Sequence, residues 1–416
     1  MDRRTFLGQA MKHLAFGSLL MGGGPGGLLL SQARAAATGR TLVVVFLRGG
    51  CDGLNMLVPH GEDAYYSLRP TLGIAPPSAG NPLSALNLDG FFGLHPSMAA
   101  LHGLYQNGWV AALPAVHYPS ASRSHFVGQD IIENATALPS TTGWLGRYLA
   151  TLSGAEQKAF ALTVGVPRSL LGSVPVSAIA DLSSLSLAAT KADQGLLAAM
   201  MASEYSRAPI VGHPYDAGLR AAGRQLQIDI AELQNVNALP TANGAAYPAT
   251  PFGRQMRQAA GLIKTRPGTE LLALDLGGWD HHRAQGGGQP DGAQAKLLNQ
   301  LSEATAAFYA DLGSAASGVL LLAVTEFGRT AAENSSGGTD HGNASSWLAV
   351  GPMVNGGVHS VAGWPGLAPT QLDEGRYLAQ STDYRDIYGE ILSRHLGVPN
   401  PSSLLAGYAA QTVGFL

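Results

Sequence analysis

The sequence predicts an α/β fold, with a mainly parallel, doubly wound sheet and a helical insertion. Short runs of apolar and β-branched residues recur along the chain, as expected of strands buried on both faces of a parallel sheet. Amphipathic helical segments separate these runs, so that strand, helix and strand alternate as in a doubly wound sheet. The 54 glycines and 24 prolines follow no fixed period and indicate many tight turns.

Composition limits the class of protein. Hydrophobic residues make up 46% of the 416 positions and charged residues only 13%, which is typical of a compact globular chain. Without residues 1–35 the chain keeps 25 − 4 = 21 basic and 28 − 1 = 27 acidic residues, a formal charge of −6. This mildly acidic balance argues against a nucleic-acid partner. The single cysteine excludes an intramolecular disulfide and a zinc site built from several cysteines.

The first residues resemble an export signal. Arg3 and Arg4 form a twin-arginine signature, an apolar Gly-rich segment spans residues 14–30, and A-x-A cleavage motifs begin at Ala33 and Ala35. We expect residues 1–35 to be a signal peptide read by the twin-arginine export machinery, with the mature chain, residues 36–416, periplasmic or secreted. The alternative, a membrane anchor after a chance arginine pair, fits poorly because the segment is short and interrupted by Pro25. No later run of about 20 apolar residues predicts a transmembrane span.

The first mature strand, residues 41–47, leads into a glycine-rich turn with Cys51 and Asp52. Ligands of open α/β sheets gather at the carboxyl ends of strands, so Asp52 is a candidate for the site. The alternative is a turn residue between glycines. Cys51 is either a nucleophile or, more often at such a position, a small buried residue.

The remaining elements follow in order. Residues 61–89 read as irregular, and residues 169–246 as an Ala-, Leu- and Gln-rich helical insertion over the sheet. Hydrophobic periodicity predicts strands at 109–116, 160–166, 270–276, 318–324 and 345–351, and helices at 95–107, about 126–134, 141–152, 251–265, 291–312 and 384–396.

A loop with the sequence YPSASRSHF opens the helix that ends near Asn134. A helix N-terminus offers free N–H groups and suits an anionic ligand or an activated hydroxyl. Ser122 or Ser124 is therefore either a nucleophile or a helix N-cap. Arg123 adds a cation. His125 adds a base or a metal ligand. Alternatively, His125 is a structural residue, and the same alternative applies to His117.

Two clusters of acids and imidazoles follow predicted strands. The first is DLGGWDHH, residues 275–282, and the second is VTEFGRTAAENSSGGTDHGNASSW, residues 324–347. Carboxylates and imidazoles together suit Zn, Mn or Fe, whereas oxygen-only sites suit Mg or Ca. We expect both clusters to meet around one or two divalent ions. The candidate ligands are Asp52, Asp280, His282, Asp340, His341 and Glu326, with His281, Asp275 and His125 in reserve.

These stretches also resemble a known family. LRGGCDGLNMLVP, LHPSM, SRSHF, LGGWDHH, TEFGRT, GGTDHGN and VAGWPGL, in this order, resemble the twin-arginine-exported bacterial family called domain of unknown function 1501. The family is grouped with the alkaline phosphatase superfamily, which includes sulfatases. The resemblance implies an alkaline-phosphatase-like α/β/α sandwich with metals at the strand ends. It matches Asp52, a serine at a helix start (Ser124 or Ser122), Asp280 with His282, and Asp340 with His341. Because TEFGR stands where that superfamily has Asp-His, Glu326 is expected to replace one ligand.

The resemblance implies an exported, metal-dependent hydrolase of phosphate or sulfate esters. Its substrate would be a small-molecule or glycan anionic ester, and its cofactor Zn, Mn or Mg. In this reading Ser124 attacks the ester or the metal activates water, and Arg123 or Arg329 clamps the anionic oxygens. The alternative is a non-catalytic exported accessory or binding protein on a degenerate phosphatase-like scaffold.

Overall fold

The computed structural model describes residues 39–416, apart from residues 120–121, 137, 153–157, 175, 185–190, 209, 211–215, 217–219, 221–222, 224–229, 231–232 and 267. The predicted signal peptide, residues 1–35, lies outside the described residues. Among the described residues, no helix combines the length and the apolar character needed to cross a bilayer.

A nine-stranded sheet forms the centre of the molecule, in the order β11-β5-β10-β9-β1-β8-β6-β7, with β12 also paired to β5. The strands are β1 (Thr41–Arg48), β5 (Val110–His117), β6 (Ala159–Leu162), β7 (Ser177–Ala178), β8 (Leu271–Gly277), β9 (Val319–Val324), β10 (Ser345–Val350), β11 (Gly357–Val358) and β12 (Thr382–Asp383). The strand pairings described in this sheet are parallel, except those of β10 with β5 and β9. The predicted mainly parallel α/β sheet is therefore confirmed.

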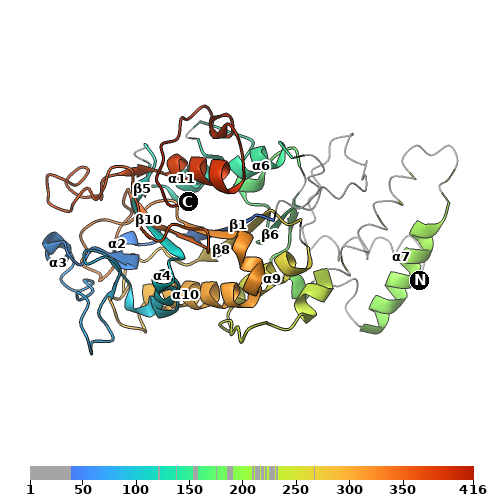
Figure 1. The fold of residues 1–416 in the computed structure, drawn as a ribbon, viewed down its shortest axis with the longest axis horizontal. Coiled ribbons are helices and arrows are strands. Elements are labelled where there is room, and N and C mark those ends of the chain that lie inside the picture. Colours follow the sequence, from blue (N-terminus) through green and yellow to red (C-terminus); the bar gives the residue numbers. More distant parts are fainter. Residues whose placement is uncertain are drawn as a thin grey trace.

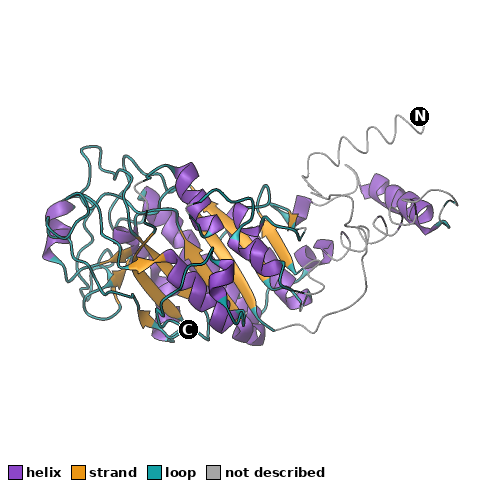
Figure 2. Cartoon of the chain, turned by 90° about the horizontal axis from the view of Figure 1, so that it is seen from above, coloured by secondary structure: helices purple, strands orange, loops and turns teal. Residues whose placement is uncertain are grey.

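Helices cover both faces of this sheet (Figure 1). One face carries α4 (Ala99–Gln106), α9 (Pro251–Thr265) and α10 (Ala293–Leu312), and the other carries α5 (His125–Asn134), α6 (Trp144–Leu149) and α11 (Tyr384–Glu390). Strand β1 shows why: Val43 and Val45 pack into the first core, whereas Val44 and Phe46 pack into the second. Alternate side chains of a strand point to opposite faces, so a continuous apolar strand serves two helical layers. Figure 2 shows the strands between these helices.

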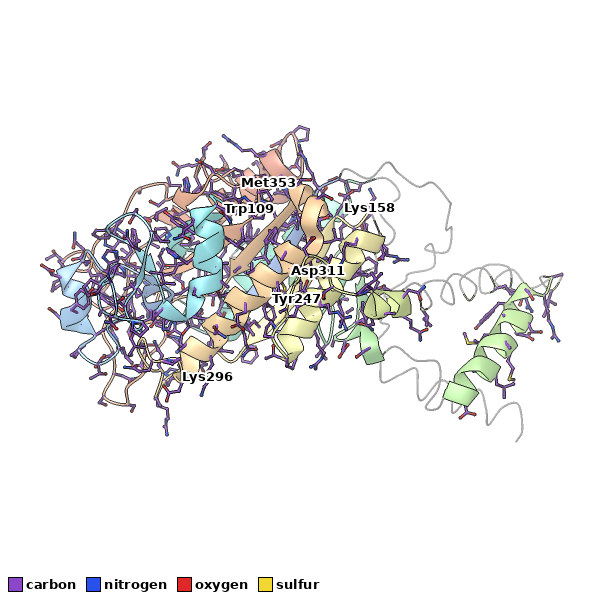
Figure 3. All side chains as sticks on the ribbon, turned by 60° about the horizontal axis from the view of Figure 1, so that its bottom comes forward. Trp109, Lys158, Tyr247, Lys296, Asp311 and Met353 are labelled. Carbon is purple, nitrogen blue, oxygen red and sulfur yellow. The ribbon has the colours of Figure 1, made fainter. Side chains whose placement is uncertain are left out.

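Polar side chains connect α10 to α9 and to the residues just before α9. Asp311, near the end of α10, is buried and accepts hydrogen bonds from the Tyr247 hydroxyl at 3.0 Å and from Lys264 of α9 at 2.7 Å (Figure 3). A buried carboxylate is stable when it is paired and hydrogen-bonded in this way. This contact ties α9 and the residues before it to α10.

Several predicted elements are shorter than expected. β6 ends at Leu162, four residues before the predicted end, because Thr163 turns the chain by donating its hydroxyl to the Gly165 carbonyl at 2.6 Å. α6 begins only at Trp144, after a turn at Ser140 and Thr142. The predicted helix 95–107 is split into a 3-10 turn (Pro96–Met98) and α4, and the last predicted helix continues after α11 as a π-helical turn (Ile391–His395).

The segment 53–94, expected to be irregular over most of its length, contains short helices and a small second sheet. The helices are α2 (Gly53–Met56) and α3 (Asp63–Leu68), and the sheet runs β2 (Leu57–Val58), β4 (Gly93–Leu94), β3 (Leu86–Asn87).

The predicted insertion, residues 169–246, includes many of the residues that are not described. Its described part contains the edge strand β7 and helix α7 (Lys191–Ser206), which lies apart from the sandwich in Figure 1.

Candidate metal centre

Two loops at the carboxyl ends of β8 and β9 lie side by side and are joined by hydrogen bonds. The Thr339 N–H donates to the His281 carbonyl at 3.1 Å, the Ala284 N–H to Ser336 at 3.0 Å, and the Gln285 N–H to Gly337 at 2.8 Å. We call residues 281–285 and 334–339, with these bonds, the loop ladder. The two sequence clusters expected to meet are therefore brought together, at the edge of the sheet where ligands of α/β proteins bind.

Three imidazoles and one carboxylate converge beside the loop ladder. Asp280 Oδ1 lies 3.1 Å from His282 Nε2, 3.2 Å from His341 Nε2 and 3.5 Å from His125 Nε2. The Nε2 atoms of His282 and His341 are 3.1 Å apart. The ligand atoms of His125, Asp280 and His341 all lie within 4.8 Å of one another, close enough to hold one metal ion. We call these four residues the His-Asp cluster.

The opposite ring nitrogen of each histidine is held by an acceptor. His125 Nδ1 lies 2.8 Å from Glu326 Oε1, His282 Nδ1 lies 3.1 Å from Asp340 Oδ1, and His341 Nδ1 lies 2.8 Å from the Arg123 carbonyl. Carboxylate and carbonyl oxygens only accept hydrogen bonds, so each Nδ1 carries the proton of the neutral ring. When the rings are neutral, as metal binding requires, all three Nε2 atoms are lone-pair acceptors that face Asp280.

A cluster of acceptors alone is electrostatically unfavourable. His125 Nε2 is buried and has no hydrogen-bond partner among the described residues, and the Nε2 atoms of His282 and His341 face each other without a proton between them. A divalent cation would relieve both problems, because neutral imidazole and carboxylate are its usual ligands and the outer hydrogen bond fixes the required tautomer. The donor set therefore fits a metal ion such as Zn, Mn or Fe better than Mg, which favours oxygen ligands.

The sequence predicts His125 only as a reserve metal ligand, whereas the structure makes it a principal member of the His-Asp cluster. It is the first residue of α5 and follows β5, and only the fold places it beside residues 280–282 and 341. Its pKa is raised, chiefly by the hydrogen bond to Glu326. One signal could have found it: the SRSHF motif puts an imidazole at a helix start after a strand, the usual position of a site.

Arg329 does not point its guanidinium at solvent as an anion clamp would. It is buried and donates to the carbonyls of Gly50 (2.6 Å), Trp279 (3.1 Å) and Thr339 (3.2 Å), to the Gly49 carbonyl, and to Asp280 Oδ1 at 2.7 Å. Burial opposes ionisation of Asp280, but the hydrogen bond and charge of Arg329 prevail and lower the pKa of Asp280 to about 2. The geometry gives Arg329 a positioning role.

Glu326 and Asp340, predicted as ligands, lie one step behind the cluster. Glu326 is buried and holds His125, and it also accepts from the Gly49 N–H at 2.9 Å and from Gln129 at 3.1 Å. Burial would raise its pKa, but these hydrogen bonds lower it. Asp340 holds His282 and pairs with Arg376 at 3.2 Å. Carboxylates in this position orient the imidazoles rather than bind the ion.

Asp52 is not brought into the His-Asp cluster. Its two oxygens accept from Arg69 at 2.6 and 2.9 Å, and Gln285 donates to Oδ2 at 2.6 Å. It also caps α2 through the Leu54 N–H at 3.3 Å. A buried carboxylate paired bidentately with an arginine has few lone pairs left, so the structure favours the structural alternative for Asp52.

The other candidate catalytic residues are Ser124, Arg123 and Cys51, and each has a different environment. Ser124 occupies the N-cap position of α5, is exposed and makes no capping bond through its side chain. The Arg123 side chain donates to Asn343 at 3.0 Å and Glu374 at 2.9 Å, and its guanidinium lies 3.7 Å from the centre of the Tyr377 ring. The Arg123 guanidinium is therefore occupied by contacts within the protein. Burial raises the pKa of the Cys51 thiol well above its usual value, which opposes a nucleophilic role.

Residues 92–398 match a protein family described as "Protein of unknown function (DUF1501)". The chain belongs to this family. The resemblance of the motifs to DUF1501 is thus confirmed, and the matched range covers the His-Asp cluster and the loop ladder. No curated protein matches the chain.

A solved structure similar to this DUF1501 chain is the crystal structure of the phosphonate monoester hydrolase of Agrobacterium radiobacter. The two share 11% sequence identity over 90% of this chain and 79% of that one, with a TM-score of 0.31. At this score the similarity adds no argument about fold or activity.

Proposed function

We propose that this DUF1501 protein is a metal-dependent hydrolase of phosphate or sulfate esters. The observation that carries the proposal is the His-Asp cluster, in which three imidazole lone pairs and Asp280 converge at the carboxyl ends of the strands. The ester class rests on the resemblance of the motifs to the alkaline phosphatase superfamily. A divalent ion bound there would act as a Lewis acid and lower the pKa of a nearby hydroxyl or water.

The residues of the chain would bind and orient the reactants. The cluster is open on one side, since the side chains of Asp280 and His282 are 47% and 43% exposed, so an ester can reach it. Glu326, Asp340 and the Arg123 carbonyl keep each Nδ1 protonated and each Nε2 aimed inward. Fixing ligands in advance in this way lowers the reorganisation needed during the reaction.

The nucleophile is Ser124 or a water molecule. Ser124 directly precedes the cluster member His125, is exposed, and is free of a capping bond. A hydroxyl at the start of α5 also lies near free helix N–H groups, which favour negative charge. A serine nucleophile would form a covalent ester with the transferred group as the bond to the substrate alcohol breaks and the alcohol leaves with a proton. Water would then hydrolyse this ester and regenerate the serine hydroxyl.

We also propose that the mature chain acts in the periplasm or outside the cell. The support is the twin-arginine signature at Arg3 and Arg4, with its apolar segment and cleavage motifs.

Metal analysis and an ester screen test the proposed function together. The metal content of the purified protein is measured by mass spectrometry in wild type and in His125→Gln, Asp280→Asn and His341→Gln. Each preparation is also assayed with p-nitrophenyl phosphate and p-nitrophenyl sulfate after loading with Zn, Mn or Mg. We expect near-stoichiometric metal and ester cleavage in wild type, and the loss of both in the three variants.

His281→Gln is the matched control, because His281 adjoins His282 in the loop ladder but its side chain forms no hydrogen bond or ion pair with the His-Asp cluster among the described residues. It should keep wild-type metal content and activity. Unchanged metal content in all three cluster variants would refute the site. Stoichiometric metal without cleavage of either ester would favour the alternative, an accessory or binding protein on a phosphatase-like scaffold.

A further inference from the structure

The sequence assigned anion recognition to Arg123 and Arg329, yet both guanidiniums are engaged inside the protein. The Arg329 side chain is 1% exposed, and its Nε, Nη1 and Nη2 atoms donate to four backbone carbonyls and Asp280. Arg123 is shared among Asn343, Glu374 and the Tyr377 ring. An anionic substrate needs other cations at the mouth of the site.

Two exposed arginines adjoin His282, one along the chain and one through Asp340, and both have donors to spare. Arg283 follows His282 in the loop ladder, is exposed, and makes no hydrogen bond or ion pair with any residue that the structure describes. The Arg376 side chain is 55% exposed, and among the described residues its one ion pair is with Asp340 Oδ2, at 3.2 Å.

A side-chain ion pair holds Arg376 near the cluster, and backbone contacts hold Arg283 there. Arg376 is connected to it through Asp340, whose other oxygen lies 3.1 Å from His282 Nδ1. Arg283 is held by the loop ladder, because Gly338 lies so close that a Cβ there would stand 2.5 Å from the Arg283 backbone nitrogen. Asn334 adds a bond to the His282 carbonyl at 2.9 Å and a weaker one to Asp340 at 3.3 Å.

The charges around the cluster indicate the class of anion. The charged residues in or paired with it are three acids (Asp280, Glu326, Asp340) and two arginines (Arg329, Arg376). Arg283, the next residue after His282, adds a third positive charge, so the formal sum with neutral histidines is 3 − 3 = 0. A divalent ion would bring the sum to +2. A phosphate monoester, a dianion, balances this charge, whereas a sulfate ester or phosphate diester carries only one negative charge.

We propose that Arg283 and Arg376 form the anion-recognition subsite and select dianionic phosphate monoesters. This inference rests on the proposed function, since it assigns the substrate of the same site. Both guanidiniums offer planar pairs of donors, which suit the oxygens of a phosphate group.

Calorimetric titration with two ligands that are not esters tests the subsite without turnover. Methylphosphonate, a dianion at alkaline pH, and methanesulfonate, a monoanion of similar shape, are titrated into wild type, Arg283→Gln, Arg376→Gln and the double variant. We expect wild type to bind methylphosphonate more tightly than methanesulfonate. Each single substitution should weaken methylphosphonate binding about tenfold or more and narrow the difference between the two ligands.

Arg254→Gln is the control, because Arg254 is a similarly exposed arginine of α9 that pairs with Asp181 at 3.6 Å. Equal methylphosphonate affinity in wild type and the double variant, or tighter binding of methanesulfonate, would overturn the subsite. The metal content of each variant separates the two proposals. Wild type without metal defeats the proposed metal chemistry, whereas methylphosphonate binding to metal-free protein that is lost in the double variant still supports the subsite.

Discussion

At the scale of single residues, the candidate metal site depends on side chains that lie behind the four members of the His-Asp cluster. Arg329 joins the turn after β1, the loop after β8 and residue Thr339 through its hydrogen bonds. Glu326 links His125 to the Gly49 N–H. These two residues therefore convert three strand ends into one rigid set of ligands.

Replacing Arg329 by lysine should weaken both the site and the fold. An ammonium group has three donors on a flexible stem and cannot reach five fixed acceptors, so several buried oxygens would lose their partners at about 1–3 kcal/mol each. We expect metal affinity to fall at least tenfold and the urea midpoint to drop. Metal titration and urea unfolding measure these effects. Arg123→Lys, at a partly exposed position, should have a smaller effect on both, and an equal effect would contradict the positioning role.

Glu326→Gln keeps an acceptor for His125 Nδ1 but removes the negative charge behind the ring. A carboxylate makes the imidazole a stronger ligand, so metal affinity should fall about 10- to 100-fold. Competition with a chromogenic chelator measures the affinity. Glu333→Gln is the control, since Glu333 accepts backbone N–H groups of Thr71 and Leu72 and lies outside the cluster. Unchanged affinity in Glu326→Gln would show that the charge is not needed.

At the scale of elements, the loop ladder aligns the two halves of the site. Gly338 allows the close approach, because a Cβ there would meet the His282 carbonyl carbon at 2.4 Å and the Arg283 nitrogen at 2.5 Å. Both neighbours are backbone atoms, which cannot rotate away. The ladder is thus sensitive to a single methyl group.

Gly338→Ala should push the two loops apart. His282 belongs to one segment of the loop ladder and His341 follows the other, so separating the segments moves the two imidazoles apart. We expect metal affinity to fall by tenfold or more, with a loss of thermal stability of a few degrees. Metal titration and thermal unfolding monitored by circular dichroism test this. Gly277→Ala, at the end of β8, adds a methyl group into open space and should leave both quantities near wild type. The same result for both variants would sink the argument.

The sequence predicted elements well where they bury continuous apolar runs, as in β1, β8 and β9, because such runs need two covered faces. It predicted that the two acid–imidazole loops meet, because both follow parallel strands of one sheet. It could not place Asp52, since Arg69 and Gln285 capture that carboxylate only in three dimensions. Likewise, nothing local distinguishes a cluster member such as His341 from a residue behind the cluster such as Asp340.

At the scale of the whole molecule, the stability of the fold should depend on pH through buried histidines. Burial lowers the pKa of His95 and of His395 to about 4. His95 lies against the Gly287 carbonyl at 3.1 Å, and His395 against the Thr41 carbonyl at 3.1 Å. Both rings are therefore neutral in the folded protein at pH values where the unfolded chain begins to bind protons.

Lowering the pH from about 6.5 to about 4 should destabilise the protein. In this window the unfolded state binds more protons than the folded state, so the free energy of unfolding falls by up to about 3 kcal/mol for each histidine. Urea unfolding at pH 7.5 and pH 5 measures the change. His395→Gln should reduce the pH dependence, whereas His102→Gln, at the surface, should not. An unaltered pH dependence in His395→Gln would refute the assignment.

The ligands of the His-Asp cluster come from three distant parts of the chain, at the start of α5 and after β8 and β9. None of them is a preformed local motif, so an unfolded chain presents no complete set of ligands. The ion would therefore be acquired late, after the sheet has assembled. If the chain follows the predicted twin-arginine route, which carries folded proteins, metal loading would take place in the cytoplasm before export. The metal available inside the cell, rather than outside it, would then determine which ion occupies the site.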